Sequence, residues 1–599
     1  MNSLPTRDQI DNKYKWRLED IYENDILWEN DIIKVKALLK SIENFKGKID
    51  NPKNLLDILT LQDEINLIAE KVFTYARMRR DEDNSNSYYQ SLCDKAMILL
   101  SEVKQSLSFI VPEILSISTD KLLSFFEIEK KLEFYRIYIE DLLRRKKHTL
   151  SQEEEYILAL SSELSNSPNQ IFSMFNDADI KFPNIIDENG NEIELTKGRY
   201  VQFLKNKDRR VRKDAFYKLY ETYAAYKNTI SATYSASVKR DIFYAKARKY
   251  NSSLEASLDN DNIPISVYDN LIAVVNNHLD LHKRYLNLRR EILNLDQLNM
   301  YDVYVPLVDD VNVKIKYEDA SNIVIESIKP FGTEYMEVVK QAFNSSWIDV
   351  YENRGKTSGA YSWGCYGVHP YILLNYQDSL DDVFTLAHEM GHSMHTYYSY
   401  KNQPYIYSDY SIFVAEVAST LNEILLTNYL LNNFDDEKQK LYIINHYLDE
   451  FRATVFRQTM FAEFEKITHE SLEQGIPLTT ETLCNIYFDL VKKYFGDVTN
   501  VNEQIAFEWM RIPHFYRAFY VFKYATSFSA ATSLSVEILN GNSDAIKKYL
   551  NFLSSGSLKY PIELLKDAGV DMNTPKPIES AMKVFEEMLN KFEKLLKFR

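Results

Sequence analysis

The sequence predicts a mainly α-helical protein. Only 14 Gly and 15 Pro occur among its 599 residues, which favours long helices over many turns. Apolar residues also recur at spacings of three and four, most clearly in the stretch 54–80, where they are Leu55, Ile58, Leu59, Ile65, Ile68, Val72 and Phe73. A chain of this length has ample core for one large globular unit or for several domains.

The N-terminal part of the chain is predicted to form one helix after another. We expect helices at residues 28–45, 54–80, 87–109 and 121–143. The basic run 144–148 then places cations at the C-terminus of a helix, on a solvated surface.

This helical pattern is interrupted at residues 183–197. An Asn189-Gly190 pair lies there between two short apolar runs, which is typical of a β-hairpin. Helices are expected again from 200 to 295, one of them beginning near Asp208, and residues 296–318 are predicted as a loop or weak strands. We therefore expect an N-terminal helical region at 1–200 and a second domain at 201–599.

Composition limits the partners and the compartment. The net charge of −16 makes nucleic acid or an anionic membrane surface an unlikely partner, because both need basic patches. The three cysteines are far apart and odd in number, so we expect reduced thiols and no disulfide framework. The N-terminus lacks the apolar core of a signal peptide, and no stretch reaches the roughly 18 apolar residues of a membrane helix. We expect a cytoplasmic protein.

The run His388-Glu389-Met390-Gly391-His392 spells H-E-x-x-H and is the most informative motif. On a helix its two histidines share one face, one turn apart, and can occupy two corners of a tetrahedral zinc site. Glu389 can then act as general base on a water molecule at the metal. The preceding Asp378-Ser379 supplies a helix N-cap. A bare motif also occurs by chance in ordinary helices, so further ligands are needed to support the interpretation.

The third ligand is expected outside the motif. The extension H-E-x-x-H-x-x-G-x-x-H is excluded, because His395 stands at the Gly position and Tyr398 at the third His position. The apolar helical segment 411–430 contains two acids, Glu416 and Glu423, two turns apart. We take Glu416 as the ligand and Glu423 as a partner that orients an imidazole, with salt-bridged or solvent-facing acids as the alternative.

The other histidines are predicted to play no part in metal binding. We expect His395 to pack or to form hydrogen bonds. The pair His278 and His282 also has i,i+4 spacing, but it has no adjacent Glu and lies in a polar helix, so both are expected at the surface.

A Gly- and aromatic-rich segment precedes the motif and leads into a predicted strand at 369–376. Pro370 near its start suggests an edge strand, which can receive an extended peptide as an added strand. The substrate-binding candidates are Gly359, Tyr361, Tyr371, Leu373 and Asn375. An ordinary buried strand is the alternative.

A final cluster spans residues 511–524 and contains His514, Tyr516, Tyr520 and Tyr524, the tyrosines at four-residue spacing. Phenol and imidazole donors can stabilise the negative charge that develops during peptide hydrolysis. From the residues alone, such a tyrosine stripe is more often part of a core.

Four segments in this order resemble the thimet-type zinc oligopeptidases, most closely bacterial oligoendopeptidase F. They are GAYSWGCYGVHPYILLNYQ, LAHEMGHSMH, FVAEVASTLNE and RIPHFYRAFYVFKYATSFSAA, and the resemblance covers roughly residues 200–585. It implies a nearly all-α fold of neurolysin or thermolysin-like zincin type, with two helical lobes enclosing a deep substrate channel and a small β element next to the active-site helix. The domain at 201–599 would then be the zinc peptidase catalytic domain.

The same resemblance implies the roles of individual residues. One Zn²⁺ per chain would be bound by His388, His392 and Glu416, with Glu389 as the base. His514 matches the family pattern, and the tyrosines of its segment would face the substrate. Phe519 stands where a Tyr is expected by counting, so Tyr516, Tyr520 and Tyr524 are all candidates, with Tyr524 favoured.

The expected function is that of a zinc metalloendopeptidase that hydrolyses internal bonds of short oligopeptides, acting as a monomer. One alternative is a zinc carboxypeptidase or dipeptidase on a related helical fold. Another is a peptide-binding protein with structural zinc, although structural zinc usually has four protein ligands and only three are found.

Overall fold

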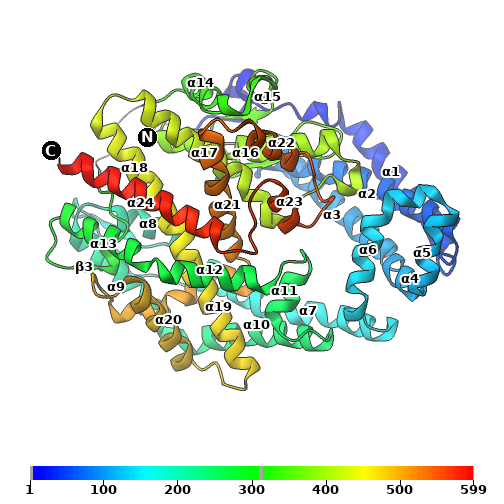
Figure 1. Ribbon diagram of the computed structural model, residues 1–599, viewed down its shortest axis with the longest axis horizontal. Coiled ribbons are helices and arrows are strands. Elements are labelled where there is room, and N and C mark those ends of the chain that lie inside the picture. The colour runs from blue at the N-terminus through cyan, green and yellow to red at the C-terminus, as the bar shows by residue number, and fades with distance from the viewer. Residues whose placement is uncertain (1–3, 309–313, 598–599) are drawn as a thin grey trace. The chain divides into compact units, whose positions relative to one another are not determined.

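The computed structural model describes residues 4–308 and 314–597, and it is mainly helical, as predicted (Figure 1). The chain divides into two compact units, each assembled from three separate stretches. Unit 1 contains Met1–Gln152, Asn312–Tyr429 and Leu534–Gly569. Unit 2 contains Glu153–Val311, Leu430–Ser533 and Val570–Arg599. The predicted boundary between an N-terminal region at 1–200 and a catalytic domain at 201–599 stays a prediction.

Unit 1 begins with a group of packed helices, coloured blue to cyan in Figure 1. Asn24 starts the first of them by accepting hydrogen bonds from the backbone N–H groups of Ile26 and Leu27. The buried indole of Trp28 donates to the carbonyl of Val72 (2.9 Å) and so ties the first helix to the second. The helices are α1 (Asp25–Ile42), α2 (Pro52–Glu82), α3 (Ser87–Leu107), α4 (Ile110–Ser116), α5 (Thr119–Ile128) and α6 (Arg136–Arg145).

The single helix expected at 121–143 is wrong. Two helices, α5 and α6, occupy this stretch, and a 3₁₀ segment at Lys130–Tyr135 separates them. Glu129 leaves the helical conformation (φ −120°, ψ 94°), and its carboxylate accepts from the N–H of Lys131. This side chain ends one helix and caps the next turn, which apolar spacing does not reveal.

The rest of unit 1 surrounds a small sheet. Its strands are β4 (Ile348–Asp349), β5 (Tyr361–Trp363) and β6 (Tyr371–Leu373), in the order β4-β6-β5. β6 pairs with β4 in parallel and with β5 in antiparallel register. The helices are α14 (Tyr317–Ser327), α15 (Thr333–Asn344), α16 (Leu380–Asn402), most of α17 (Ile412–Asn433), α22 (Ser543–Leu553) and α23 (Pro561–Asp567).

The prediction that the strand after Pro370 is an edge strand is wrong. β6 is the central strand, because β4 takes its second side, and all three of its residues are buried. The edge next to α16 is instead β5, which contacts that helix. Within the described residues β6 is its only strand partner.

Unit 2 is also built from helices, with one confirmed hairpin. Strands β1 (Asn184–Ile186) and β2 (Glu192–Glu194) pair antiparallel, and the Asp187 carboxylate accepts from the N–H groups of Asn189 and Asn191 in the turn. The predicted weak strand in 296–318 is β3 (Leu298–Asn299), which pairs in parallel with β7 (Thr499–Asn500), and the portion 309–313 lies outside the described residues.

The helices of unit 2 follow the expected order after residue 200, and Asp208 caps one of them by accepting from the N–H of Arg210. They are α7 (Gln152–Met174), α8 (Lys197–Lys205), α9 (Arg209–Ala225), α10 (Lys227–Ala247), α11 (Ser253–Asp259), α12 (Ile265–Asn277), α13 (Leu279–Ile292), α18 (Glu437–Phe451), α19 (Arg457–Glu473), α20 (Thr480–Phe495), most of α21 (Phe522–Leu539) and α24 (Lys576–Lys597).

Candidate metal centre

The H-E-x-x-H motif lies in the middle of α16, and a capping box fixes the start of this helix. The hydroxyl of Ser379 accepts from the N–H of Asp382 (3.1 Å), and the Asp382 carboxylate accepts from the N–H of Ser379 (2.9 Å). From this start the helix runs unbroken past His388 and His392, so both imidazoles project from the same face.

Helices α16 and α17 meet at Gly391. A Cβ atom at this position would lie 2.6 Å from the carbonyl oxygen of Ala418 and 2.6 Å from the Cα of Ser419, both in α17. The two helices are also joined by Asn422, whose buried side-chain amide donates to the carbonyl of Ala387 (3.1 Å). A side chain larger than hydrogen at 391 is therefore incompatible with this separation, which brings the acids of α17 to the histidines of α16.

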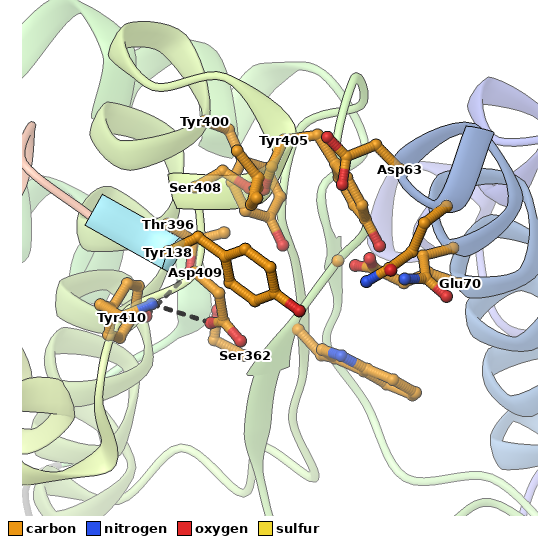
Figure 2. Close-up of a pocket in the computed structure, with 15 residues that line it drawn as sticks. Asp63, Glu70, Tyr138, Ser362, Thr396, Tyr400, Tyr405, Ser408, Asp409 and Tyr410 are labelled. Carbon is orange, nitrogen blue, oxygen red and sulfur yellow. Dashed lines mark hydrogen bonds between the residues drawn. The ribbon is translucent and has the colours of Figure 1, made fainter. Parts of the chain in front are cut away.

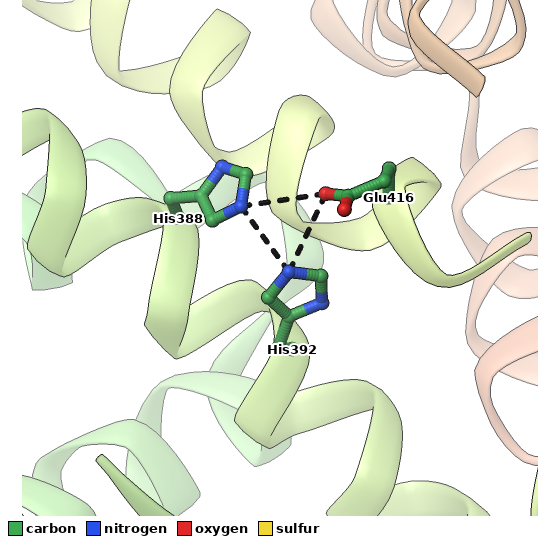
Figure 3. A group of neighbouring side chains, drawn as sticks. All are labelled: His388, His392 and Glu416. Carbon is green, nitrogen blue, oxygen red and sulfur yellow. Dashed lines mark hydrogen bonds and ion pairs between the residues drawn. The ribbon is translucent and has the colours of Figure 1, made fainter. Parts of the chain in front are cut away.

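The three predicted ligands come together (Figure 3). His388 Nε2 and His392 Nε2 are 3.2 Å apart, and each lies 3.4 Å from Glu416 Oε2. In a tetrahedral zinc site with bonds near 2.1 Å, ligand atoms are about 3.4 Å apart. The triangle in this structure therefore has the size that a zinc ion requires. Two imidazoles and a carboxylate are also a donor set typical of catalytic zinc.

Glu423 holds the first imidazole from the opposite side. Its Oε1 lies 2.6 Å from His388 Nδ1, which leaves Nε2 directed toward Glu416. Burial lowers the pKa of His388, but the carboxylates of Glu423 and Glu416 outweigh it and raise this pKa well above the ordinary value. Burial likewise raises the pKa of Glu416, but hydrogen bonds from His388 and His392 lower it far below the usual range.

Glu389, the predicted general base, differs from Glu416 and Glu423 in being buried. Its side chain is buried, and burial raises its pKa above the ordinary value, although His388 and His392 act in the opposite direction. A carboxylate with a raised pKa is a stronger base, which suits the predicted role.

The expected substrate residues fall into two groups. Tyr371 and Leu373 are fully buried in β6, and the Tyr371 hydroxyl donates to the backbone carbonyl of Arg17. Gly359, Tyr361 and Asn375 lie nearer the surface, and the Asn375 amide donates to the carbonyl of Gly359 (2.8 Å). An added strand at β6 is excluded because both of its sides are already paired.

Strand β5 is attached to the motif helix by hydroxyl groups. Ser362 Oγ lies 2.8 Å from Ser393 Oγ, one residue after the second histidine of the motif. This contact holds β5 against α16, at the residue that follows His392.

A cavity of about 410 Å³ adjoins this strand within unit 1 (Figure 2). Figure 2 shows Asp63 and Glu70 projecting into it from α2, facing tyrosine side chains of the segment 400–410. Asp409 adds a third carboxyl group, and none of the lining residues is basic. Burial raises the pKa of Asp63 to about 6 and that of Glu70 to about 7. The tyrosines of the lining are Tyr138, Tyr400, Tyr405 and Tyr410.

The predicted oxyanion residues form a second cluster, in unit 2. His514 is exposed, and its ring centroid lies 6.0 Å from those of Tyr520 and Tyr524, which are themselves 5.5 Å apart. Tyr516 does not join them: its hydroxyl lies 2.9 Å from Thr233 Oγ1, and the ring is buried. The segment therefore brings together His514, Tyr520 and Tyr524 and assigns Tyr516 to the core.

The remaining histidine predictions have mixed outcomes. His395 packs as expected, because it is 1% exposed and stacks on Tyr410 with ring centroids 3.7 Å apart. The surface position predicted for His282 is wrong: it is 1% exposed and stacks on Phe456 (4.7 Å). Its Nδ1 bonds to the carbonyl of Tyr494 (3.1 Å), a partner 212 positions away in the sequence.

Two residues that position the site were not identified from the sequence. Gly391 and Asn422 bind no ligand, yet they set the distance between α16 and α17. The glycine inside the motif was the available signal, because a helix interior seldom contains Gly without a packing reason.

Comparisons with known proteins agree with this arrangement. Residues 202–584 match the model of peptidase family M3, and residues 113–182 match that of oligopeptidase F. The chain is 49% identical to oligopeptidase PepF of Bacillus subtilis over 596 residues, covering 99% of this chain and 89% of that protein. It is 42% identical to an oligoendopeptidase F homolog of Lactococcus lactis, with 98% of each chain covered.

Solved structures show the same fold. A putative peptidase from Chlamydophila abortus superposes with a TM-score of 0.92 at 35% identity, over 99% of this chain and 100% of that one. Oligoendopeptidase-F from Enterococcus faecium gives a TM-score of 0.77 at 39% identity, over 96% and 100%. Across residues 4–308 and 314–597, no helix combines the length and the hydropathy of a membrane-spanning segment. The matched ranges and the full-length identities establish that the chain belongs to peptidase family M3, as an oligopeptidase F-type metallopeptidase.

Proposed function

We propose that this enzyme is a zinc endopeptidase that hydrolyses internal bonds of short oligopeptides. The observation that carries the proposal is the triangle of His388, His392 and Glu416, whose ligand atoms lie 3.2–3.4 Å apart beside the carboxyl group of Glu389. A bound zinc ion supplies Lewis-acid polarisation of the scissile carbonyl and increases the acidity of the attacking water.

The acid–base step belongs to Glu389. Its carboxylate accepts a proton from the attacking water and later donates this proton to the leaving amine. Burial supports both halves of the cycle, because a raised pKa makes the group a better base and allows the protonated form to persist until the amine leaves.

The peptide is proposed to extend along β5 rather than β6. The outer edge of β5 has no strand partner among the described residues, so an extended peptide can add to it as a further strand. Gly359 and Tyr361 belong to this segment, and the adjoining cavity has room for a substrate side chain.

His514 is proposed to stabilise the developing oxyanion, with a tyrosine hydroxyl as second donor. Although His514 is exposed at the surface, partial desolvation of its ring and the nearby Arg517 guanidinium lower its pKa, which favours the neutral imidazole with one N–H to donate. Tyr524 and Tyr520 are the candidates, because both rings lie beside His514. We further propose a cytoplasmic monomer with one zinc ion, and the three free cysteines are consistent with a reducing compartment.

The deciding variant is Glu389→Gln. It should retain zinc in the stoichiometry of the wild type and lose at least about 10³-fold in kcat, because the amide cannot accept the proton. Retained cleavage by this variant would overturn the mechanism. Mass spectrometry of products from peptides of increasing length then decides between this function and its alternative. Internal cuts support an endopeptidase, whereas stepwise loss of one terminal residue would indicate a carboxypeptidase or dipeptidase.

A further inference from the structure

Glu465 on α19 is a buried acid that the reaction described above does not use. Its side chain has no exposed surface, Oε1 accepts from the backbone N–H of Phe519 (2.9 Å), and Oε2 has no hydrogen-bond partner in the described part of the chain. Burial raises its pKa well above the ordinary value, which favours the protonated, uncharged form. A polar group buried with half of its bonding capacity unused costs stability, which favours a role beyond packing.

The residue that Glu465 binds has an unfavourable backbone conformation. Phe519 has φ of +55°, in the left-handed region that bulky side chains rarely adopt. Its ring packs against those of His469 (4.5 Å) and Tyr268 (5.8 Å). The hydrogen bond to Glu465 satisfies the backbone N–H of Phe519. The turn at Phe519 is therefore held both by the packing of its ring and by this backbone hydrogen bond.

This turn lies between His514 and Tyr520, two of the three residues of the proposed oxyanion cluster, which also contains Tyr524. His514 precedes it, Tyr520 follows it immediately, and the chain reverses so that their rings lie nearly parallel with centroids 6.0 Å apart. The first part of the segment is anchored separately, because Arg240 donates to the carbonyl of Tyr516 (3.2 Å). The conformation at Phe519 is therefore what sets the position of Tyr520 relative to His514.

We propose that Glu465 is a positioning residue for peptide hydrolysis: its carboxyl group holds the Phe519 turn and thereby aligns Tyr520 with His514. The titratable groups beside it are His469, one turn further along α19, whose Nδ1 bonds to the backbone carbonyl of Glu465, and Asp241 of α10, which lies 3.4 Å from His469 Nε2. Neither reaches Oε2, so within residues 4–308 and 314–597 the backbone N–H of Phe519 is the one hydrogen-bond donor to this carboxyl group. This inference rests on the proposed role of His514.

The test compares Glu465→Met with Glu465→Gln. Gln keeps an oxygen acceptor at Oε1 and should stay within about 3-fold of the wild-type kcat. Met has a similar volume but no acceptor for the Phe519 N–H, and should lower kcat by about 10-fold or more, with KM within 3-fold and zinc content unchanged. Full kcat in Glu465→Met would overturn the proposal.

A double-mutant cycle separates positioning from general damage to the fold. In a His514→Ala background, Glu465→Met should cause less than about 3-fold further loss, because the cluster it aligns is already incomplete. The same loss in both backgrounds would assign Glu465 a purely structural role. If Glu465→Met fails to fold by circular dichroism, Glu465→Asp replaces it. One methylene shorter, Asp cannot reach the Phe519 N–H in place, and full kcat in that variant would equally overturn the proposal.

The control for the proposed function is His514→Ala alone, which should lose about 10²–10³-fold in kcat. If His514→Ala keeps the wild-type kcat, the oxyanion role of His514 and the positioning role of Glu465 are both wrong. If His514→Ala loses kcat as expected while Glu465→Met is fully active, only the positioning role is wrong.

Discussion

Replacing Gly391 with Ala tests how the ligand triangle is held together. The added Cβ would lie 2.6 Å from the carbonyl oxygen of Ala418, whereas ordinary contact begins near 3.4 Å. The Cβ is fixed in place by the backbone of α16, and the oxygen belongs to the backbone of α17. The helices must therefore separate by roughly 0.8 Å, because no side-chain rotation relieves the contact. Glu416 Oε2, now 3.4 Å from each imidazole nitrogen, would then lie about 4.2 Å away, which a tetrahedral ion with bonds near 2.1 Å cannot span.

The expected result is a loss of zinc affinity. We expect about 10- to 100-fold, or roughly 1.4–2.7 kcal/mol, because the flexible Glu416 side chain recovers part of the distance. The affinity is measured by competition with a chromogenic chelator, and circular dichroism monitors the helical content. Helix propensity alone would favour Ala by about 1 kcal/mol, so propensity and packing predict opposite signs for stability.

Gly198→Ala is the matched control. Gly198 also lies in a helix, α8, but a Cβ there meets only Thr196 Oγ1, at 4.0 Å. This control should leave zinc affinity unchanged and stabilise the fold by up to about 1 kcal/mol. Wild-type zinc affinity in Gly391→Ala would refute the reasoning that close helix contact sets the triangle.

Three further predictions concern zinc affinity, the pH dependence of stability and substrate preference. Glu423→Ala should weaken zinc binding about 10- to 100-fold while Glu423→Gln loses less, as measured by chelator competition, because the amide can still hold the His388 ring. Burial lowers the pKa of His282 and His395 to about 3, against about 6.5 in an unfolded chain, so protons bind the unfolded chain more tightly. The free energy of unfolding, from urea titrations, should therefore fall below about pH 6.5, by about 2 kcal/mol per histidine at pH 5, and a flat profile would contradict this. In the cavity beside β5, burial raises the pKa of Glu70 to about 7, so this carboxyl group becomes negatively charged between about pH 6 and pH 8. The preference of the enzyme for Lys over Gln in substrate peptides should therefore grow over this pH range. In the Glu70→Gln variant the preference should no longer depend on pH.

Much of the metal centre could be predicted from the sequence, because its spacing rules are local. The spacing of the motif places two imidazoles on one face of a helix. A carboxyl group within an apolar helix costs free energy unless it has a partner, and this argument identified Glu416 and Glu423. The structure brings both acids to His388. The Asn-Gly hairpin was predictable for the same reason, since its turn residues specify it directly.

Features set by distant partners could not be predicted in this way. Strand β6 was predicted to be an edge strand because Pro370 lies near its start. Its second neighbour, β4, could not be predicted, since it is two residues long and carries no recognisable pattern. His282 was assigned to the surface because its neighbours in sequence are polar. It is nevertheless buried, since Phe456 and Phe495 enclose its ring from far along the chain. The helix break at Glu129 depends on one side chain turning back to cap the next turn, which apolar periodicity does not record.

The division of each unit into three separate stretches has a consequence for how the protein is made. Helix α16 emerges from the ribosome well before α22, although Phe552 of α22 packs against His395 of α16 (ring centroids 5.2 Å apart). Unit 1 therefore lacks part of its core until Gly569 has been synthesised, and unit 2 until α24 is complete. A nascent chain has both histidines of the motif and both acids of α17 long before it has a finished scaffold to hold them. Stable metal loading is consequently expected only after the last stretch of unit 1, Leu534–Gly569, has been synthesised.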